Sequence, residues 1–217
     1  MILYATPLSS YSAKVRIVLC AKGVAFDERE PAGGYRSAAY REIVPLGTLP
    51  AIDDEGFVLS ESEAINEYLE ERFPEPPLLP RTLAARARAR FLSRFHDLYL
   101  EPPVRGLFPH VSPLRREPVA VAARIAELRQ RVAQLADMVE PGPFLAGEHL
   151  SLADCGYAVT LPLAGMLLAA LGDTLVLPPL LEHWQAALGR HPAVERALGG
   201  WRPATVRWIA TRLAETA

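Results

Sequence analysis

The chain has 217 residues, half of them hydrophobic, so it can bury one large core or two modest ones. A formal net charge of −2 argues against a nucleic-acid binder, because binding phosphates requires a basic face. The two cysteines match no zinc or redox spacing, so we expect no bound metal and two reduced thiols in the protein core, in the cytoplasm.

The first 80 residues alternate strands and helices in the order βαβαββα. The pattern predicts strands over residues 2–4, 24–29, 49–52 and 57–59, and helices over residues 11–22, 36–43 and 61–73. A parallel crossover followed by a hairpin gives a mixed sheet. The sequence therefore predicts an α/β domain with a mixed four-stranded sheet and flanking helices.

The approach to the third strand suggests a place for an extended ligand. Pro50 lacks an N–H, so it belongs at the first position of a strand or at an edge. If the Leu49–Pro50 bond is cis, Leu49 turns outward beside Thr48, with its backbone N–H and C=O unpaired. Such groups suit an extended peptide.

The helix over residues 61–73 opens with a carboxylate and a hydroxyl, those of Glu61 and Ser62. The free N–H groups at a helix start suit a ligand carboxylate, and the Glu61 side chain attracts an ammonium group. The pair suits the end of an α-amino acid. The alternative is an ordinary helix start capped by Ser60 or Ser62.

A proline-rich stretch over residues 74–80 marks the boundary between two domains, residues 1–80 and residues 81–217. Every strong pattern in the second domain is helical. We predict helices over residues 82–100, 118–139, 152–171 and 180–188, and two shorter ones around Val194 and Trp208. Ser151 and Asp154 form a predicted capping box, and Pro162 is expected to kink the helix that follows.

Residues 155–172 are uncharged and long enough to resemble a membrane span. Asp154 and Asp173 bound the segment tightly, and it contains a threonine, a proline and a glycine, so a buried helix is the better interpretation. The N-terminus shows no charged stretch followed by an apolar one. We therefore expect a cytoplasmic protein with no membrane and no nucleic acid among its partners.

Five short motifs, in order, resemble those of the cytosolic glutathione transferase superfamily over nearly the whole chain. They occupy residues 9–17, 45–50, 61–65, 78–80 and 151–154. The resemblance implies a thioredoxin-like first domain, an all-α helical bundle as the second, glutathione as co-substrate and a homodimer. Ser9-Ser10 ahead of Val15-Arg16 is similar to the zeta class, whose members isomerise maleylacetoacetate.

The resemblance also assigns roles to single residues. Leu49, flanked by Thr48 and Pro50, pairs by backbone with the cysteinyl part of glutathione, and Glu61 with Ser62 holds the γ-glutamyl end. Ser9 faces the sulfur, and Ser10 is the second choice. Tyr4 and Tyr11 are competitors, because some classes use a tyrosine. The residues expected to line the pocket of a small electrophile are Tyr11, His96, Tyr99 and Phe108.

The implied chemistry requires a thiolate, which a hydroxyl near the start of the first helix stabilises. Serine donates a hydrogen bond without being consumed, so Ser9 argues against a thiol oxidoreductase. Many members carry a lysine, glutamine or histidine near Gly47 or Thr48 for the glycyl carboxylate. This chain has no such residue there, which implies either a weak affinity for glutathione or another cation at the glycyl carboxylate.

Three functions fit these residues. The first is a glutathione transferase that adds the thiolate to a small electrophile. The second is a glutathione-dependent isomerase of the maleylacetoacetate or maleylpyruvate type, although Tyr11 and Ala13 replace the cysteine and tryptophan usual in the zeta class. The third is a non-catalytic binding module that keeps the fold.

Overall fold

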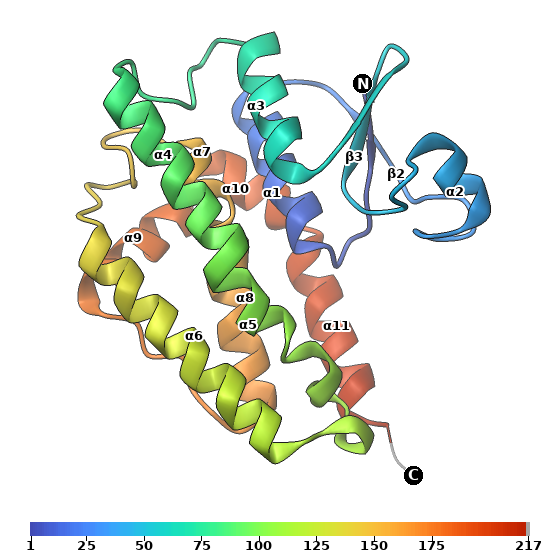
Figure 1. The fold of residues 1–217 in the computed structure, drawn as a ribbon, viewed down its shortest axis with the longest axis vertical. Coiled ribbons are helices and arrows are strands. Elements are labelled where there is room, and N and C mark those ends of the chain that lie inside the picture. Colours follow the sequence, from blue (N-terminus) through green and yellow to red (C-terminus); the bar gives the residue numbers. More distant parts are fainter. Residues whose placement is uncertain (216–217) are drawn as a thin grey trace.

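Four short strands form one mixed sheet near the N-terminus of the computed structural model, which describes residues 1–215 (Figure 1). The strands are β1 (Ile2–Tyr4), β2 (Asp27–Arg29), β3 (Ala51–Asp54) and β4 (Phe57–Ser60). Their order in the sheet is β2-β1-β3-β4, with β1 parallel to β2 and the other neighbours antiparallel. This confirms the predicted mixed four-stranded sheet.

The second strand is shorter than predicted. Residues 24–26 lie outside it, because the Val24 N–H bonds to the Leu19 carbonyl (3.0 Å) and so extends the end of the first helix. The third strand begins two residues later than expected, at Ala51, since Pro50 has no N–H for the ladder.

Three helices accompany the sheet: α1 (Ser10–Ala21), α2 (Ala38–Ile43) and α3 (Ser62–Arg72). Helices α1 and α3 pack against each other between the sheet and the rest of the chain, whereas α2 lies on the far side of the sheet (Figure 1). Tyr40 of α2 packs its ring against Tyr4 of β1, with 5.7 Å between ring centroids. The helices thus cover both faces, as in the predicted thioredoxin-like arrangement.

Beyond α3 the described chain is helical. Its α-helices are α4 (Leu83–Phe95), α5 (Glu101–Arg105), α6 (Pro118–Met138), α7 (Leu152–Cys155), α8 (Tyr157–Ala170), α9 (Pro179–Arg190), α10 (Pro192–Leu198) and α11 (Trp201–Leu213). A π-helix, η1 (His96–Leu100), and two 3₁₀ turns, η2 (Phe108–Val111) and η3 (Pro113–Arg115), complete the set. The all-helical second part is as predicted.

The single helix predicted over residues 82–100 is wrong at its C-terminal end, residues 96–100. Pro102 and Pro103 follow it and lack the N–H groups that would continue an α-helical ladder from Leu98 and Tyr99. The Glu101 N–H bonds instead to the His96 carbonyl, five residues back. The chain therefore passes from α4 through a π-helical turn into α5, a feature often found at functional sites.

The apolar segment near residue 160 lies in the core. It divides into α7 and α8 at Gly156, and α8 continues through Pro162. The predicted capping box is present, with the Ser151 N–H and hydroxyl both bonding Asp154 (2.9 and 2.6 Å). Of its most apolar window, 78% is buried inside the protein, as expected for a core helix.

The connection between α3 and α4, residues 73–82, carries no helix or strand. Glu70 of α3 fixes its path by accepting hydrogen bonds from the backbone N–H groups of Leu78 and Leu79 (3.0 Å each). One buried apolar cluster runs from the sheet into the bundle. Cys155 is part of this cluster, but Cys20 is half-buried and so is not the core thiol we expected.

Candidate active site

A cavity of about 800 Å³ lies between the sheet and the helical bundle. The loop after β1, the approach to β3 and the start of α3 form one side, and η1, α5 and α11 form the other. The predicted site residues that line it are Ser9, Tyr11, Thr48, Leu49, Pro50, Glu61, Ser62 and Phe108. The fold thus brings these sequence-distant residues to a single site.

Ser9 caps the start of α1 at the wall of this cavity. Its Oγ accepts a hydrogen bond from the Ser12 N–H (3.1 Å). One acceptor lone pair of the hydroxyl is therefore used, and its proton remains available for a group in the cavity. The partial positive charge of the helix start acts at the same point.

Ser10 does not line the cavity. It is buried, and its hydroxyl accepts from Arg105 Nη2 (3.1 Å) and donates weakly to Glu101 Oε1 (3.5 Å). These partners turn Ser10 toward α5. Between the two predicted serines, only Ser9 reaches the cavity.

The Leu49–Pro50 peptide bond is cis. Within residues 1–215, the backbone N–H and C=O of Leu49 have no hydrogen-bond partner. The preceding residue is fixed because the Tyr40 hydroxyl donates to the Thr48 carbonyl (3.0 Å). Leu49 thus offers one free donor and one free acceptor to an extended ligand.

Glu61 and Ser62 open α3 without capping it. Glu61 occupies the N-cap position with φ +76°, unusual for a residue with a side chain, and makes no side-chain capping bond. Ser62 begins the helix itself, so the expected capping by a serine is wrong. Both side chains are free to face the cavity that they line.

The tyrosines are less suited to activate a ligand thiol. The Tyr11 hydroxyl donates to Glu101 Oε2 (3.1 Å), and burial together with the charge of Glu101 raises the pKa of Tyr11 well above its ordinary value. Tyr4 lies half-buried in the sheet against Tyr40 and does not line the cavity.

Comparison with known proteins decides the family. Residues 3–77 match the family model for the glutathione S-transferase N-terminal domain. A glutathione S-transferase of Pseudomonas putida is 31% identical over 163 residues, or 75% of this chain and 74% of the relative. The chain belongs to the glutathione S-transferase family.

Two other relatives show the breadth of this family. A stringent starvation protein A homolog of Pasteurella multocida is 34% identical over 156 residues, 71% of this chain and 70% of the relative. The structure of a maleylpyruvate isomerase, a bacterial zeta-class glutathione S-transferase, has a TM-score of 0.76 and 29% identity, covering 94% of this chain and 99% of that chain. The resemblance with zeta-like features is confirmed.

Two residues predicted to line the electrophile pocket, His96 and Tyr99, lie outside the cavity. His96 is buried below the cavity wall, where its ring bonds Asp97 and Thr160. Tyr99 is half-exposed and packs against Phe95, with 5.4 Å between ring centroids. The π-helical register of η1 turns Asp97 and Leu98, rather than these two, toward the cavity.

The structure adds cavity residues that sequence reasoning missed: Tyr35, Arg36, Glu63, Arg94, Asp97, Leu98, Arg105, Leu163, Thr205 and Trp208. Arg105 stacks over the rings of Tyr11 and Phe108, 5.1 and 5.5 Å from their centroids. No local motif marks these positions. Among residues 1–215, no group of His, Cys, Asp or Glu side chains is placed to hold a metal ion.

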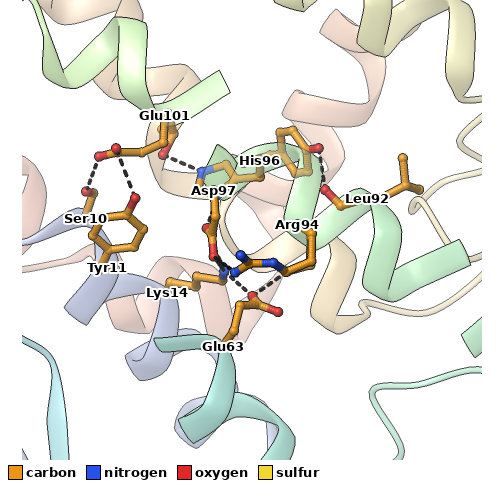
Figure 2. A network of polar contacts seen from close by, with 12 residues as sticks. Ser10, Tyr11, Lys14, Glu63, Leu92, Arg94, His96, Asp97 and Glu101 are labelled. Atoms are coloured by element: carbon orange, nitrogen blue, oxygen red, sulfur yellow. Dashed lines mark hydrogen bonds and ion pairs between the residues drawn. The ribbon is translucent and has the colours of Figure 1, made fainter. Parts of the chain in front are cut away.

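A buried polar network supports the wall of the cavity (Figure 2). Lys14 of α1 is almost fully buried, and its Nζ contacts Glu63 and both carboxylate oxygens of Asp97 (3.0 and 3.1 Å). Ser93 donates to Glu63 Oε1 (2.6 Å). Burial alone would raise the pKa of Asp97, but the His96 hydrogen bond and the Lys14 charge outweigh it and lower this pKa to about 2.

Proposed function

We propose that this chain is a glutathione transferase that conjugates the glutathione thiolate to a small electrophile held in the cavity. One observation carries the proposal: Ser9 at the start of α1 lines the same cavity as Leu49, Glu61 and Ser62. A hydroxyl donor, a free backbone pair and an acidic helix start are the groups that an extended, zwitterionic peptide thiol requires.

In the proposed binding mode, glutathione lies across the first part of the chain. Its γ-glutamyl carboxylate meets the start of α3 and the Ser62 hydroxyl, and its ammonium group meets Glu61. The cysteinyl N–H and C=O pair with the free backbone groups of Leu49. This places the sulfur on the Ser9 side of the cavity.

Arg36 is the cation that we assign to the glycyl carboxylate. It lines the cavity, has φ +72°, and its carbonyl accepts a hydrogen bond from Arg41 Nε (3.2 Å). Gly47 permits this loop, because a Cβ there would lie 3.1 Å from Arg36 Cα. Arg36 therefore fills the role for which the sequence offered no residue near Gly47.

Ser9 acts by stabilising the thiolate. The ordinary thiol is a poor nucleophile at neutral pH, and each pKa unit by which the site lowers it corresponds to about 1.4 kcal/mol. The Ser9 hydroxyl and the start of α1 both favour the anion. The thiolate then attacks the electrophile, and Ser9 itself forms no covalent bond.

The second candidate function is a glutathione-dependent cis–trans isomerase. The specific observation in its favour is that Arg105 lines the cavity beside Tyr11 and Phe108, where a guanidinium group suits a substrate carboxylate. The solved bacterial isomerase that this chain resembles acts on maleylpyruvate, by its name. In such a reaction the thiolate adds to a double bond, permits rotation and leaves unchanged.

The test of thiol activation is Ser9→Ala with glutathione and 1-chloro-2,4-dinitrobenzene. Removing the donor is expected to lower kcat about 10²-fold and to change the Kd for glutathione by less than about threefold. Thr82→Ala is the matched control, since Thr82 caps α4 and lies outside the cavity. Equal turnover in Ser9→Ala and the parent protein removes Ser9 from this role.

Two further measurements separate the candidate functions. Turnover of a cis-enedione acid without net consumption of glutathione favours the isomerase over the transferase. Calorimetry with millimolar glutathione tests both, because a ligand that binds the folded state raises the melting temperature. If glutathione neither binds nor raises the melting temperature, the chain is a non-catalytic binding module.

We also propose that the protein is a cytoplasmic homodimer. Phe57 on the β3–β4 hairpin and Phe91 on α4 are about half exposed. A partner copy would cover them. Light scattering gives the molar mass of the parent protein and of Phe57→Glu in solution. If both proteins have the same mass, the hairpin is not part of a dimer interface.

A further inference from the structure

A second pocket lies toward the C-terminal end of α1, away from Ser9. Its volume is about 430 Å³, and it shares no lining residue with the cavity around Ser9. The later turns of α1 and the segment leading into β2 form one side, and α10 with the start of α11 forms the other. Helix α10 packs against α1 here (Figure 1). A ligand in this pocket would contact both parts of the chain and leave the proposed glutathione site free.

Arg16 of α1 lines this pocket and has donors that the protein does not use. Its Nε and Nη2 donate to the two carboxylate oxygens of Glu28 (2.5 and 2.8 Å), and Nη2 also donates to the Thr6 carbonyl (2.9 Å). Its Nη1 is buried and has no hydrogen-bond partner among residues 1–215. Because a guanidinium carries N–H groups on all three nitrogens, those on Nη1 remain for a ligand.

Trp201, the first residue of α11, adds a second unpaired donor to the same pocket. It is 1% exposed, and nothing in the described chain accepts a hydrogen bond from its Nε1. The indole nitrogen is a donor only, so only an acceptor can satisfy it. Buried donors without partners are exceptions in folded proteins, and each one costs free energy. Two of them on one pocket indicate a site for an acceptor.

The charge of the pocket favours an anion. Arg196 of α10 lines it with an exposed side chain and takes part in none of the ion pairs within the described residues. Arg16 and Arg196 together outweigh Glu28, which leaves one net positive charge. Both arginines also act on Cys20 in the pocket wall. Burial raises the pKa of this thiol, whereas the charges of Arg196 and Arg16 oppose the rise.

The rest of the wall defines the shape of the ligand. Pro7, Val24 and Phe26 form an apolar side. The pocket is open above Gly200, where a Cβ would meet no atom within 4 Å. A fitting ligand is small, with one carboxylate for the donors and an apolar body for this side. Phosphate fits less well, because it carries more charge and has no apolar part.

We propose that this pocket binds a small monocarboxylate with an apolar body, whose oxygens accept hydrogen bonds from Arg16 Nη1, Trp201 Nε1 and the Arg196 guanidinium. The bound carboxylate would satisfy two buried donors that otherwise have no partner. The site goes beyond the proposed function and does not depend on it, because it takes no residue from the glutathione cavity.

Cys20 provides a local reporter of occupancy. It lines the pocket and is half-buried, whereas the other cysteine, Cys155, is fully buried. Cys20 does not line the glutathione cavity. A carboxylate bound in that cavity would therefore leave the reactivity of Cys20 unchanged.

The experiment follows the alkylation of the native protein by iodoacetamide, a neutral reagent, with intact-protein mass spectrometry. The rate is measured at increasing concentrations of benzoate and constant ionic strength, and its concentration dependence gives the Kd for benzoate. Benzamide and inorganic phosphate are measured in the same way. Cys20→Ser shows that the labelled thiol is Cys20.

Saturating benzoate is expected to slow the alkylation of Cys20 about threefold or more, because it fills the pocket and its charge disfavours the thiolate. Benzamide has the same ring without the charge and should leave the rate within about twofold. Phosphate should protect Cys20 less than benzoate does. Equal protection by benzamide or by phosphate contradicts the proposed ligand class. If benzoate gives no protection up to tens of millimolar, the site itself is wrong.

Two variants test the assigned donors. Arg196→Gln should raise the Kd for benzoate about three- to tenfold, because a charge-assisted hydrogen bond is lost. The matched control is Arg202→Gln, which changes an exposed arginine of α11 outside this pocket and should leave the Kd within about twofold. Equal losses in these two variants would show a general charge effect and overturn the proposal.

Trp201→Phe removes the indole N–H and keeps an aromatic ring, so it should also raise the Kd for benzoate about three- to tenfold. Thermal melts show whether each variant is folded. An unchanged Kd in folded Trp201→Phe contradicts the role of Nε1. If Trp201→Phe does not fold, the comparison of Arg196→Gln with Arg202→Gln still decides the proposal.

Discussion

Lys14 of α1 and Asp97 of η1 form a buried ion pair across the junction of the sheet and the helical bundle, with 3.0 Å between Nζ and Oδ1. The same ammonium contacts Glu63 of α3. One lysine therefore ties together three segments that surround the cavity. Because Lys14 is almost fully shielded from water, these contacts are weakly screened by salt.

Lys14→Met is expected to lower the free energy of unfolding by about 3–5 kcal/mol, because it leaves two partly buried carboxylates without their cation. Urea denaturation measures this loss. The control is Arg129→Met, which removes an exposed ion pair to Asp173 and should cost less than about 1 kcal/mol. If the two variants lose similar amounts of unfolding free energy, burial does not make the Lys14 contacts stronger than an exposed ion pair.

Asp97 predicts a pH dependence of stability. Its pKa is about 2 in the folded protein, below its ordinary value, so its contribution is fully present above about pH 4 and is lost as the pH falls toward 2. The contribution is about 2 kcal/mol. Urea denaturation of the parent protein and Asp97→Asn should differ most at pH 6 and least near pH 2, and a constant difference contradicts this.

Asp154 predicts a stability effect far from the cavity. Besides Ser151, it accepts hydrogen bonds from the Leu145 N–H and Trp184 Nε1, 2.9 Å each, at a fully buried position. Asp154→Asn places an NH₂ group against these donors and should cost about 3 kcal/mol in urea denaturation. Asp137→Asn, at an exposed position of α6, is the control and should change little.

Tyr11→Phe should leave kcat with 1-chloro-2,4-dinitrobenzene within about threefold, because the Tyr11 hydroxyl is already bonded to Glu101. The steady-state assay is the one used for Ser9→Ala. A fall comparable to that expected for Ser9→Ala would transfer thiol activation from Ser9 to Tyr11.

Arg36→Ala should raise the KM for glutathione about tenfold, because a charge-assisted hydrogen bond to the glycyl carboxylate is lost. The matched ligand is γ-glutamylcysteine, which lacks glycine and should be affected less than about twofold. An equal loss for both ligands would show that Arg36 shapes the loop rather than binding the carboxylate.

The sequence by itself determined the order of the elements and part of the cavity lining. Proline before a strand, a serine before the first helix and an acidic pair opening the third are local signals, because their physical causes act within a few residues. Leu49, Glu61 and Ser62 were identified in this way, whereas Ser9 was identified by the resemblance to the glutathione transferases. Helix ends at prolines and the Ser151–Asp154 capping box follow the same rule.

Only the tertiary structure decided which residues complete the site. Lys14 finds its partners 49 and 83 positions away, and Arg105 reaches Ser10 across 95 positions. Such pairs leave no periodic or local pattern in the chain. The register of η1 is likewise a response to two later prolines and decides that Asp97, not His96, faces the cavity.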